Sequence, residues 1–222
     1  MRRREEKAEP MKIVLFGASG RIGQRIAQEA LNRGHAVTAV ARAPEAVSLQ
    51  HERLTVQAGD VRDPAVVARV AAGHDIVASA VGPSGGQAPQ MLAEAAHALI
   101  AGTKSASVAR LIVVGGAGSL EAAPGQMLLD TPTFNPAWRP GALAHLEALK
   151  VYRAEQALDW TYLSPADQIF PGERTGHFRL GGDQVLRDAN GASRISMEDF
   201  AIAVVDEIES PRFPRQRFTV AY

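Results

Sequence analysis

Cysteine is absent from the sequence, aromatic residues make up only 5% of it, and its charges cancel. Without cysteine the chain can form no disulfide, thiolate zinc site, CxxC redox pair or cysteine nucleophile. The 24 Lys and Arg residues balance 24 Asp and Glu residues, which disfavours a general nucleic-acid or membrane-surface binder. No apolar run approaches the roughly 18 residues that a membrane span needs. These absences predict a cytoplasmic globular protein with neither a nucleic-acid nor a membrane partner.

What is present indicates one domain behind a short tail. Residues 1–10 (MRRREEKAEP) are charged and lack the apolar core of a signal peptide, so we expect a disordered or tag-like tail there. The 222-residue length is routine for a single α/β domain. We therefore expect residues 11–222 to form one domain, with residues 115–222 contributing the substrate side.

Apolar runs typical of buried strands alternate with helical patterns in the first half of the chain. Strands are expected at residues 12–16, 36–41, 54–57, 75–81 and 110–114. Helices are expected at residues 21–32, 63–73 and 87–102. This alternation predicts an α/β fold of the Rossmann type, a doubly wound parallel sheet with right-handed crossovers.

The pattern changes at Gly115, because from there to about Pro140 glycine and proline are frequent and no period is visible. Loops of that length inside compact domains are usually binding loops or lids. Ser196 with Asp199 is typical of a capping box at a helix start. The later elements form a small C-terminal elaboration: a helix near 142–158, a strand at 161–164, a hairpin of 184–187 with 193–195, a helix to 209 and a strand at 217–220.

Three glycines, Gly17, Gly20 and Gly23, follow the first expected strand directly and open the first helix. In dinucleotide-binding proteins the first such glycine permits a tight turn, the second lets a pyrophosphate approach the backbone, and the third lets the helix pack against the strand. The free N–H groups at the helix start then face the phosphates. The loop therefore predicts dinucleotide binding, with a purely structural turn as the alternative.

Arg42 ends the second strand, where an NAD site usually has an acidic residue. A guanidinium suits the 2′-phosphate of NADP through charge-assisted bonds, and Arg21 adds a second positive charge. We therefore expect NADP(H) to be preferred over NAD(H). The alternative interpretation of Arg42 is an exposed charge at a strand end.

Two later strand ends fit the same cofactor. Asp60, after the third strand, can accept the adenine amino proton, and Val61 can pack on the adenine ring. Residues 80–83 (AVGP) end the fourth strand, at the carboxyl edge where open α/β sheets bind ligands.

Several phrases resemble those of a known group of proteins: GxxGxxG at 17–23, VGGAGS at 114–119, DWTYLSP at 159–165, PGERTG at 171–176 and SRIS at 193–196. They are similar to the atypical short-chain dehydrogenase/reductase superfamily and, within it, to the bacterial NADH-flavin reductase group, which is related to NmrA-like and biliverdin-IXβ-reductase-like proteins. The resemblance covers about residues 11–222. It implies a Rossmann fold with an NAD(P)H site at Gly17, Ser19, Gly20, Arg21, Ile22, Gly23, Arg42, Asp60, Val61, Ala80, Val81 and Gly82.

The resemblance also implies a substrate cleft over the nicotinamide, near Gly116 and Pro165. Trp138, in the long loop, can supply a stacking surface for an acceptor, with ordinary packing of the loop as the alternative. Ser119 is a further substrate candidate in the same segment.

The sequence departs from the wider superfamily in lacking the Tyr-x-x-x-Lys pair that transfers a proton to a carbonyl. Tyr152 is followed four residues later by Gln156, and Tyr162 by Ala166. This disfavours ketone chemistry and sugar epimerisation, and it leaves the catalytic residues unassigned. The six histidines show no HxH or HExxH spacing, so no metal site is expected.

These observations predict an NAD(P)H-dependent oxidoreductase that transfers hydride to a flavin-, quinone- or azo-type acceptor. A flavin would then be a substrate rather than a bound cofactor. The alternative is an NADP(H)-binding redox sensor of the NmrA type without turnover. The expected partner is a small-molecule acceptor, and the expected assembly is a monomer or a homodimer.

Overall fold

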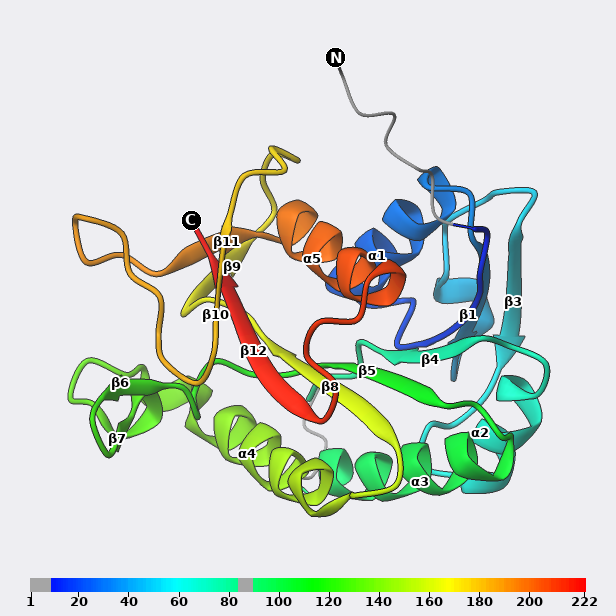
Figure 1. Cartoon of the computed structure of the whole chain (residues 1–222), viewed down its shortest axis with the longest axis horizontal. Helices are drawn as coiled ribbons and strands as arrows, with labels where there is room; N and C mark the ends of the chain where they lie inside the picture. The colour runs from blue at the N-terminus through cyan, green and yellow to red at the C-terminus, as the bar shows by residue number, and fades with distance from the viewer. Residues whose placement is uncertain (1–8, 84–89) are drawn as a thin grey trace.

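The computed structural model describes residues 9–83 and 90–222 (Figure 1). Most of the tail expected at 1–10 and the start of the helix expected at 87 fall outside these ranges. No helix in the described ranges is long and apolar enough to cross a membrane. The elements run in the order β1 (Lys12–Phe16), α1 (Arg21–Asn32), β2 (Ala36–Ala41), β3 (Leu54–Ala58), α2 (Pro64–Ala71), β4 (Ile76–Ser79), α3 (Met91–Ser105), β5 (Arg110–Val114), β6 (Glu121–Ala123), β7 (Gln126–Met127), α4 (Arg139–Ala154), β8 (Asp159–Ser164), β9 (Gln168–Phe170), β10 (Arg179–Gly181), β11 (Arg194–Ser196), α5 (Met197–Glu209) and β12 (Gln216–Ala221).

Eight strands form the central sheet, in the order β10-β12-β8-β5-β4-β1-β2-β3. All neighbouring pairs are parallel except β10 with β12. From β1 the chain first adds β2 and β3 on one side and then β4, β5, β8 and β12 on the other. This arrangement confirms the doubly wound Rossmann-type fold, and it places a topological switch point between β1 and β4, where such sheets bind ligands.

Helices cover both faces of the sheet (Figure 1). The helices α1 and α5 pack on one face, and α2, α3 and α4 pack on the other. Alternate residues of β1 explain why its whole sequence is apolar: Ile13 and Leu15 belong to the core under α1 and α5, whereas Val14 and Phe16 belong to the core over α2, α3 and α4. A strand buried on both faces needs a continuous apolar run rather than an alternating one.

The expected hairpin of 184–187 with 193–195 is wrong, although its turn forms. The Gly191 N–H donates to the Asp188 carbonyl at 3.0 Å. Residues 184–187 then contribute an isolated bridge rather than a strand. The strand β11 instead pairs in parallel with β9, far away along the chain. No local pattern could reveal this pairing, because β9 and β11 have only three residues each.

Element boundaries differ in smaller ways. The helix expected near 142–158 is α4, which begins at Arg139 and ends at Ala154. The segment expected as a loop at 115–140 contains the short strands β6 and β7 and two 3-10 turns. Propensity indicates the ends of elements less well than their interiors, because caps and tertiary contacts decide where a helix stops.

The expected capping box at α5 is half formed. The Ser196 hydroxyl accepts the Asp199 N–H at 2.9 Å, as a cap should. The Asp199 carboxylate does not bond back to the helix start; it accepts the N–H groups of Thr175 and Gly176 and the Tyr222 hydroxyl. Asp199 thereby attaches the exposed loop at 171–178 to the core.

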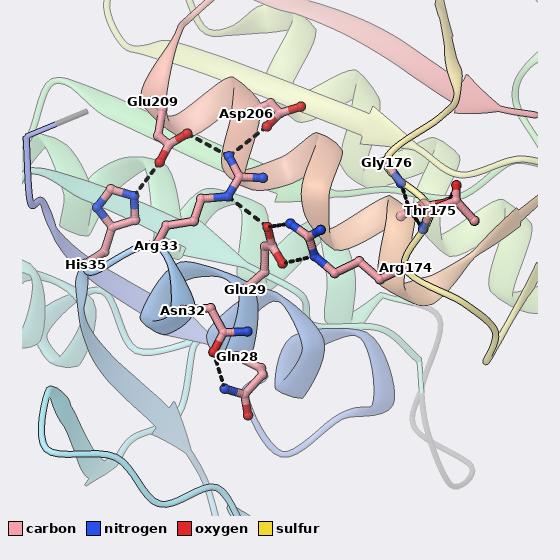
Figure 2. Close-up of polar contacts among 11 residues, drawn as sticks. Gln28, Glu29, Asn32, Arg33, His35, Arg174, Thr175, Gly176, Asp206 and Glu209 are labelled. Carbon is pink, nitrogen blue, oxygen red and sulfur yellow. Dashed lines mark hydrogen bonds and ion pairs between the residues drawn. The ribbon is translucent and has the colours of Figure 1, made fainter. Parts of the chain in front are cut away.

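A second attachment of that loop runs through a chain of ion pairs between α1 and α5 (Figure 2). Arg174 donates two hydrogen bonds to the buried carboxylate of Glu29, at 2.8 and 2.7 Å. Glu29 also accepts from Arg33, which contacts Asp206 and Glu209 on α5. One buried carboxylate therefore links the loop, α1 and α5.

We expect Glu29→Gln to lower the free energy of unfolding by about 2 kcal/mol at neutral pH, because Arg174 loses its carboxylate partner and Arg33 loses one of its three. Burial alone would raise the pKa of Glu29, but the hydrogen bonds from Arg174 and Arg33 outweigh burial and hold that pKa below its usual 4.5. A depressed pKa stabilises the folded state above the unfolded pKa, and this contribution is lost as the pH falls through the folded pKa. The difference in free energy of unfolding between wild type and variant, measured in urea, should therefore shrink as the pH falls below the usual pKa of 4.5. A gap that stays constant from neutral pH into that acid range would contradict this account.

Candidate functional site

A pocket of about 440 Å³ opens at the carboxyl ends of β1, β2, β3 and β4. This is the edge of the sheet that holds the switch point, and the volume is in the range typical of small-molecule sites. The side chains of Met91 and Met197, from the starts of α3 and α5, add to its walls. The pocket is lined by Phe16, Gly17, Ser19, Gly20, Arg21, Ile22, Val40, Ala41, Arg42, Gly59, Asp60, Val61, Arg62, Ala80, Val81, Gly82, Pro83, Met91 and Met197.

The glycine loop fits between β1, β4 and α1 so closely that side chains are excluded at two positions. Gly17 has φ of +79°, and a Cβ there would lie 2.7 Å from the carbonyl carbon of Ala80. A Cβ on Gly23 would lie only 2.1 Å from the Gly17 oxygen. The Gly20 N–H donates to that same oxygen at 3.0 Å. The loop is thus a tight backbone cradle beside the pocket.

The start of α1 borders this cradle. Gly20 is the N-cap residue, and glycine has no side chain with which to cap a helix. The first N–H groups of a helix have no partner within it, and the helix dipole favours an anion near them. The arrangement suits a phosphate group next to Ser19, Arg21 and Ile22, which line the pocket here.

The far end of the pocket carries three charged side chains from two strand ends. Arg42 follows β2, and Asp60 and Arg62 follow β3. Arg62 donates to both carboxylate oxygens of Asp60, with a shortest contact of 2.7 Å. Hydrogen bonding from Arg62 holds the pKa of Asp60 below its usual value, and the positive charge of Arg42 acts in the same direction. Two cations and one anion thus line this end, a net positive lining that suits an anionic ligand, and Glu94 on α3 lies 4.0 Å from Arg62 behind it.

Most cofactor residues expected from the sequence line this pocket. Gly23 differs, because it is buried beneath the loop and acts on the pocket through Gly17. Asp60 lines the pocket as expected, but its carboxylate is already occupied by Arg62. The expected residues that line it are Gly17, Ser19, Gly20, Arg21, Ile22, Arg42, Asp60, Val61, Ala80, Val81 and Gly82.

The four substrate candidates lie outside the pocket lining. Gly116 and Pro165 follow β5 and β8, which continue the same sheet edge beyond β4. Ser119 is buried, and its hydroxyl accepts from the Arg217 guanidinium at 2.9 Å, so its contact is with β12. The Ser119 hydroxyl is therefore engaged by Arg217 rather than by the pocket.

Trp138 is 55% exposed and lies just before α4. Three residues further on, a Cβ placed on Gly141 would lie 3.3 Å from the Pro83 ring at the pocket rim. The start of α4 is therefore next to the rim, and Trp138 is the exposed aromatic side chain closest to it in sequence.

Neither Tyr152 nor Tyr162 lines the pocket, and both are buried. Burial raises the pKa of each phenol. The Tyr162 hydroxyl donates to the His145 carbonyl at 3.1 Å and lies 3.4 Å from the Gly116 nitrogen. Burial also lowers the pKa of His145 to about 4, so its ring is neutral at pH 7. Among the residues described, the pocket therefore contains no tyrosine positioned to donate a proton.

The sequence did not single out Arg62, Met91 or Met197 as pocket residues. Arg62 had a usable local signal, since it follows Asp60 by two residues at a strand end. Met91 and Met197 had none, because the positions of α3 and α5 against the pocket depend on the folding of the whole chain.

Comparisons with known proteins agree with this fold and with a nucleotide-binding family. The family model described as NAD(P)H-binding matches residues 17–211. The protein YwnB of Bacillus subtilis is 42% identical over 213 residues, which are 95% of this chain and 98% of YwnB. A structure named "putative exported protein" from Burkholderia pseudomallei is 50% identical, with a TM-score of 0.87, over 96% of this chain and 100% of that one. A "putative NADH-flavin reductase" from Streptococcus pneumoniae is 32% identical, with a TM-score of 0.82, over 95% of this chain and 99% of that one.

Proposed function

Because the chain belongs to the NAD(P)H-binding family, we propose that it is an NAD(P)H-dependent oxidoreductase that passes hydride to a flavin-, quinone- or azo-type acceptor. The observation that carries this proposal is the pocket itself, which joins a side-chain-free glycine cradle to a net positive end at the switch point of the sheet. The likeness to a protein named as an NADH-flavin reductase supports the acceptor class.

The proposed cofactor site follows the order of the strand ends. The glycine loop and the start of α1 hold the pyrophosphate, and Arg42 with the segment 60–62 holds the adenosine half. Residues 80–83 and Met197 then border the nicotinamide. When bound, NAD(P)H supplies a hydride from its nicotinamide ring. We propose that NADP(H) is preferred over NAD(H). Arg42 lies at the end of β2, where its positive charge would face the negative 2′-phosphate of NADP(H).

The proposed acceptor class follows from which side chains lie near the nicotinamide end. Both tyrosines of the α4–β8 region are buried, and neither lines the pocket. Flavin, quinone and azo acceptors are electrophilic without protonation by a side chain, and solvent can supply the proton. The protein then contributes by orienting the acceptor and excluding water. Gly116 and Pro165, on the adjacent strand ends, are proposed to border the acceptor.

Trp138 is the proposed stacking surface for that acceptor. We expect Trp138→Ala to raise the KM for FMN about tenfold, because aromatic stacking contributes about 1 kcal/mol or more. The affinity for NADPH should stay unchanged, since Trp138 lies outside the cofactor pocket. Leu143→Ala is the matched control, because Leu143 is an exposed apolar side chain on α4. An equal change in both variants, or none in either, would contradict a specific role for Trp138.

Steady-state oxidation of NADPH by purified protein, with FMN, a quinone or an azo dye in excess, tests the proposed function. We expect saturable oxidation with at least one of these acceptors. Tight NADPH binding without oxidation across all of them would contradict the reductase proposal. It would favour the alternative, a sensor that distinguishes oxidised from reduced cofactor without turnover.

A further inference from the structure

We propose that His145 hydrogen-bonds the acceptor through its Nε2, and that Tyr162 positions His145 for this contact. The group that His145 would recognise is an N–H donor on a flat heterocycle, such as the imide N–H of a flavin, which a quinone does not have. This inference rests on the proposed function and assigns a residue that selects flavins within the proposed acceptor class.

The position of the His145 ring carries the first step. Gly116, which follows β5, is proposed to border the acceptor. A Cβ placed on Gly116 would lie 2.9 Å from Cγ and 3.0 Å from Cδ2 of His145. The imidazole therefore lies directly against Gly116, and both residues are partly exposed. Nε2 is bonded to Cδ2, so it lies at the end of the ring that is furthest from the α4 backbone.

A small cavity relates this ring to the cofactor pocket. His145 lines the cavity together with Ser79, Val81 and Tyr162, near the carboxyl ends of β4, β5 and β8. Val81 also lines the cofactor pocket, at the end where the nicotinamide is proposed to lie. His145 is therefore separated by one residue from the proposed nicotinamide end.

The contacts of the Tyr162 hydroxyl determine which nitrogen of His145 carries a hydrogen. This hydroxyl donates its one proton to the His145 carbonyl at 3.1 Å. It accepts from the Gly116 N–H at 3.4 Å and lies 3.3 Å from His145 Nδ1. Because the phenol proton is already used, the contact with Nδ1 requires a hydrogen on Nδ1. Burial keeps the ring neutral at pH 7, so Nε2 has a lone pair and no hydrogen.

The lone pair on Nε2 indicates the class of ligand. In the part of the chain that the structure describes, no residue donates a hydrogen bond to this atom. A ligand that donates satisfies such a nitrogen, whereas a ligand that only accepts leaves it unpaired. The flavin ring has an imide N–H between two carbonyl groups, and a quinone ring offers carbonyl oxygens alone. His145 therefore favours a flavin over a quinone.

Flavin fluorescence tests this contact without turnover. The full chain, saturated with NADP⁺, is titrated into FMN and into 3-methyl-FMN, in which a methyl group replaces the imide hydrogen. We expect wild type to bind FMN about tenfold more tightly than 3-methyl-FMN, because one hydrogen bond is lost. His145→Leu should bind the two flavins equally. His145→Gln, whose side-chain oxygen can accept, should recover part of the preference.

The controls separate this contact from a general loss of binding. His97→Leu replaces an exposed histidine of α3 outside both cavities and should keep the tenfold preference. His145→Leu should also keep the wild-type affinity for NADP⁺ and the wild-type KM for a quinone such as menadione. A retained preference for FMN in His145→Leu, or a matching loss of NADP⁺ affinity, would overturn the role of His145. If His145→Leu does not fold, equal binding of the two flavins by wild type would overturn it.

A double-mutant cycle tests the positioning role of Tyr162. Tyr162→Phe removes the hydroxyl that fixes the ring but leaves Nε2 in the protein, so the preference for FMN should fall to about threefold. The same change should have no effect on the preference in the His145→Leu background. An undiminished preference in Tyr162→Phe, or an effect that persists without His145, would overturn this half of the proposal.

These outcomes are separable from failure of the proposed function. Protein that binds FMN with the expected preference but oxidises no NADPH would refute the reductase proposal and leave the assignment of His145 standing. Protein that reduces a quinone with NADPH but binds no FMN would support the reductase proposal and overturn the assignment of His145.

Discussion

Replacing Gly23 with alanine should weaken NADPH binding at least about a hundredfold, since a displaced glycine loop loses the helix-end contacts to the pyrophosphate together with the close packing that aligns them. The new Cβ would lie 2.1 Å from the Gly17 oxygen and 2.9 Å from the Gly17 carbonyl carbon. Both are backbone atoms, so α1 must move away from the loop rather than a side chain turning aside. The loss of affinity is measured by titrating protein into NADPH and following the intrinsic fluorescence of the nucleotide.

Two further variants make that result interpretable. Gly182→Ala adds a methyl group at an exposed glycine whose Cβ would meet no described atom within 4 Å, so it should bind NADPH like wild type. The affinity of Gly20→Ala for NADPH should lie between those of Gly23→Ala and Gly182→Ala, because its Cβ would approach the Gly17 oxygen only to 3.3 Å. Thermal unfolding without ligand shows whether each variant is folded. Folded Gly23→Ala protein with wild-type affinity would contradict the assignment of the loop.

Reversing the charge at Arg42 should have the second largest effect. We expect Arg42→Glu to weaken NADPH about a hundredfold, because a charge-assisted contact to the 2′-phosphate is replaced by repulsion. NADH lacks that phosphate, so its affinity should change little. The preference for NADPH over NADH would then disappear or invert, and the ratio of the two dissociation constants measures it.

Arg69→Glu is the matched control for that experiment. It makes the same change of charge on α2, outside the pocket lining. It therefore measures how much of the loss in NADPH affinity comes from long-range electrostatics rather than from a direct contact. Equal losses for NADPH in both variants would assign the preference to overall charge. Equal losses for NADPH and NADH in Arg42→Glu would show that Arg42 contacts a part of the cofactor that both share.

The sequence predicted the parts of the fold that depend on local pattern. Residues 12–16 and 110–114 are strands because a strand buried on both faces needs an unbroken apolar run, and this run is visible in the sequence. The parallel pairing of β11 with β9 was invisible, because three-residue strands have no measurable period. Hairpin turn chemistry at 188–191 was present, and β11 follows it close to the expected 193–195, but residues 184–187 form no strand to pair with it.

The candidate site, like the fold, was predicted where it depends on local sequence and missed where it depends on contacts between distant segments. The glycine loop, Arg42 and the segments at 60–61 and 80–82 each follow a strand directly, so the topology of a parallel sheet brings them to one edge. Ser119 was a substrate candidate in the sequence, yet it is buried against Arg217. Met197 reaches the pocket only because α5 packs beside α1, a contact between distant parts of the chain.

An anaerobic mixture of the protein with equimolar NADPH and FMN tests the central claim most directly. If the pocket holds the cofactor and directs its hydride to a flavin, the absorbance of NADPH and of oxidised FMN should fall together, one for one, far faster than without protein. The Gly23→Ala variant should not support that rate. Bound NADPH with no loss of FMN absorbance above the protein-free rate would contradict hydride transfer to this acceptor, and no NADPH binding would contradict the site itself.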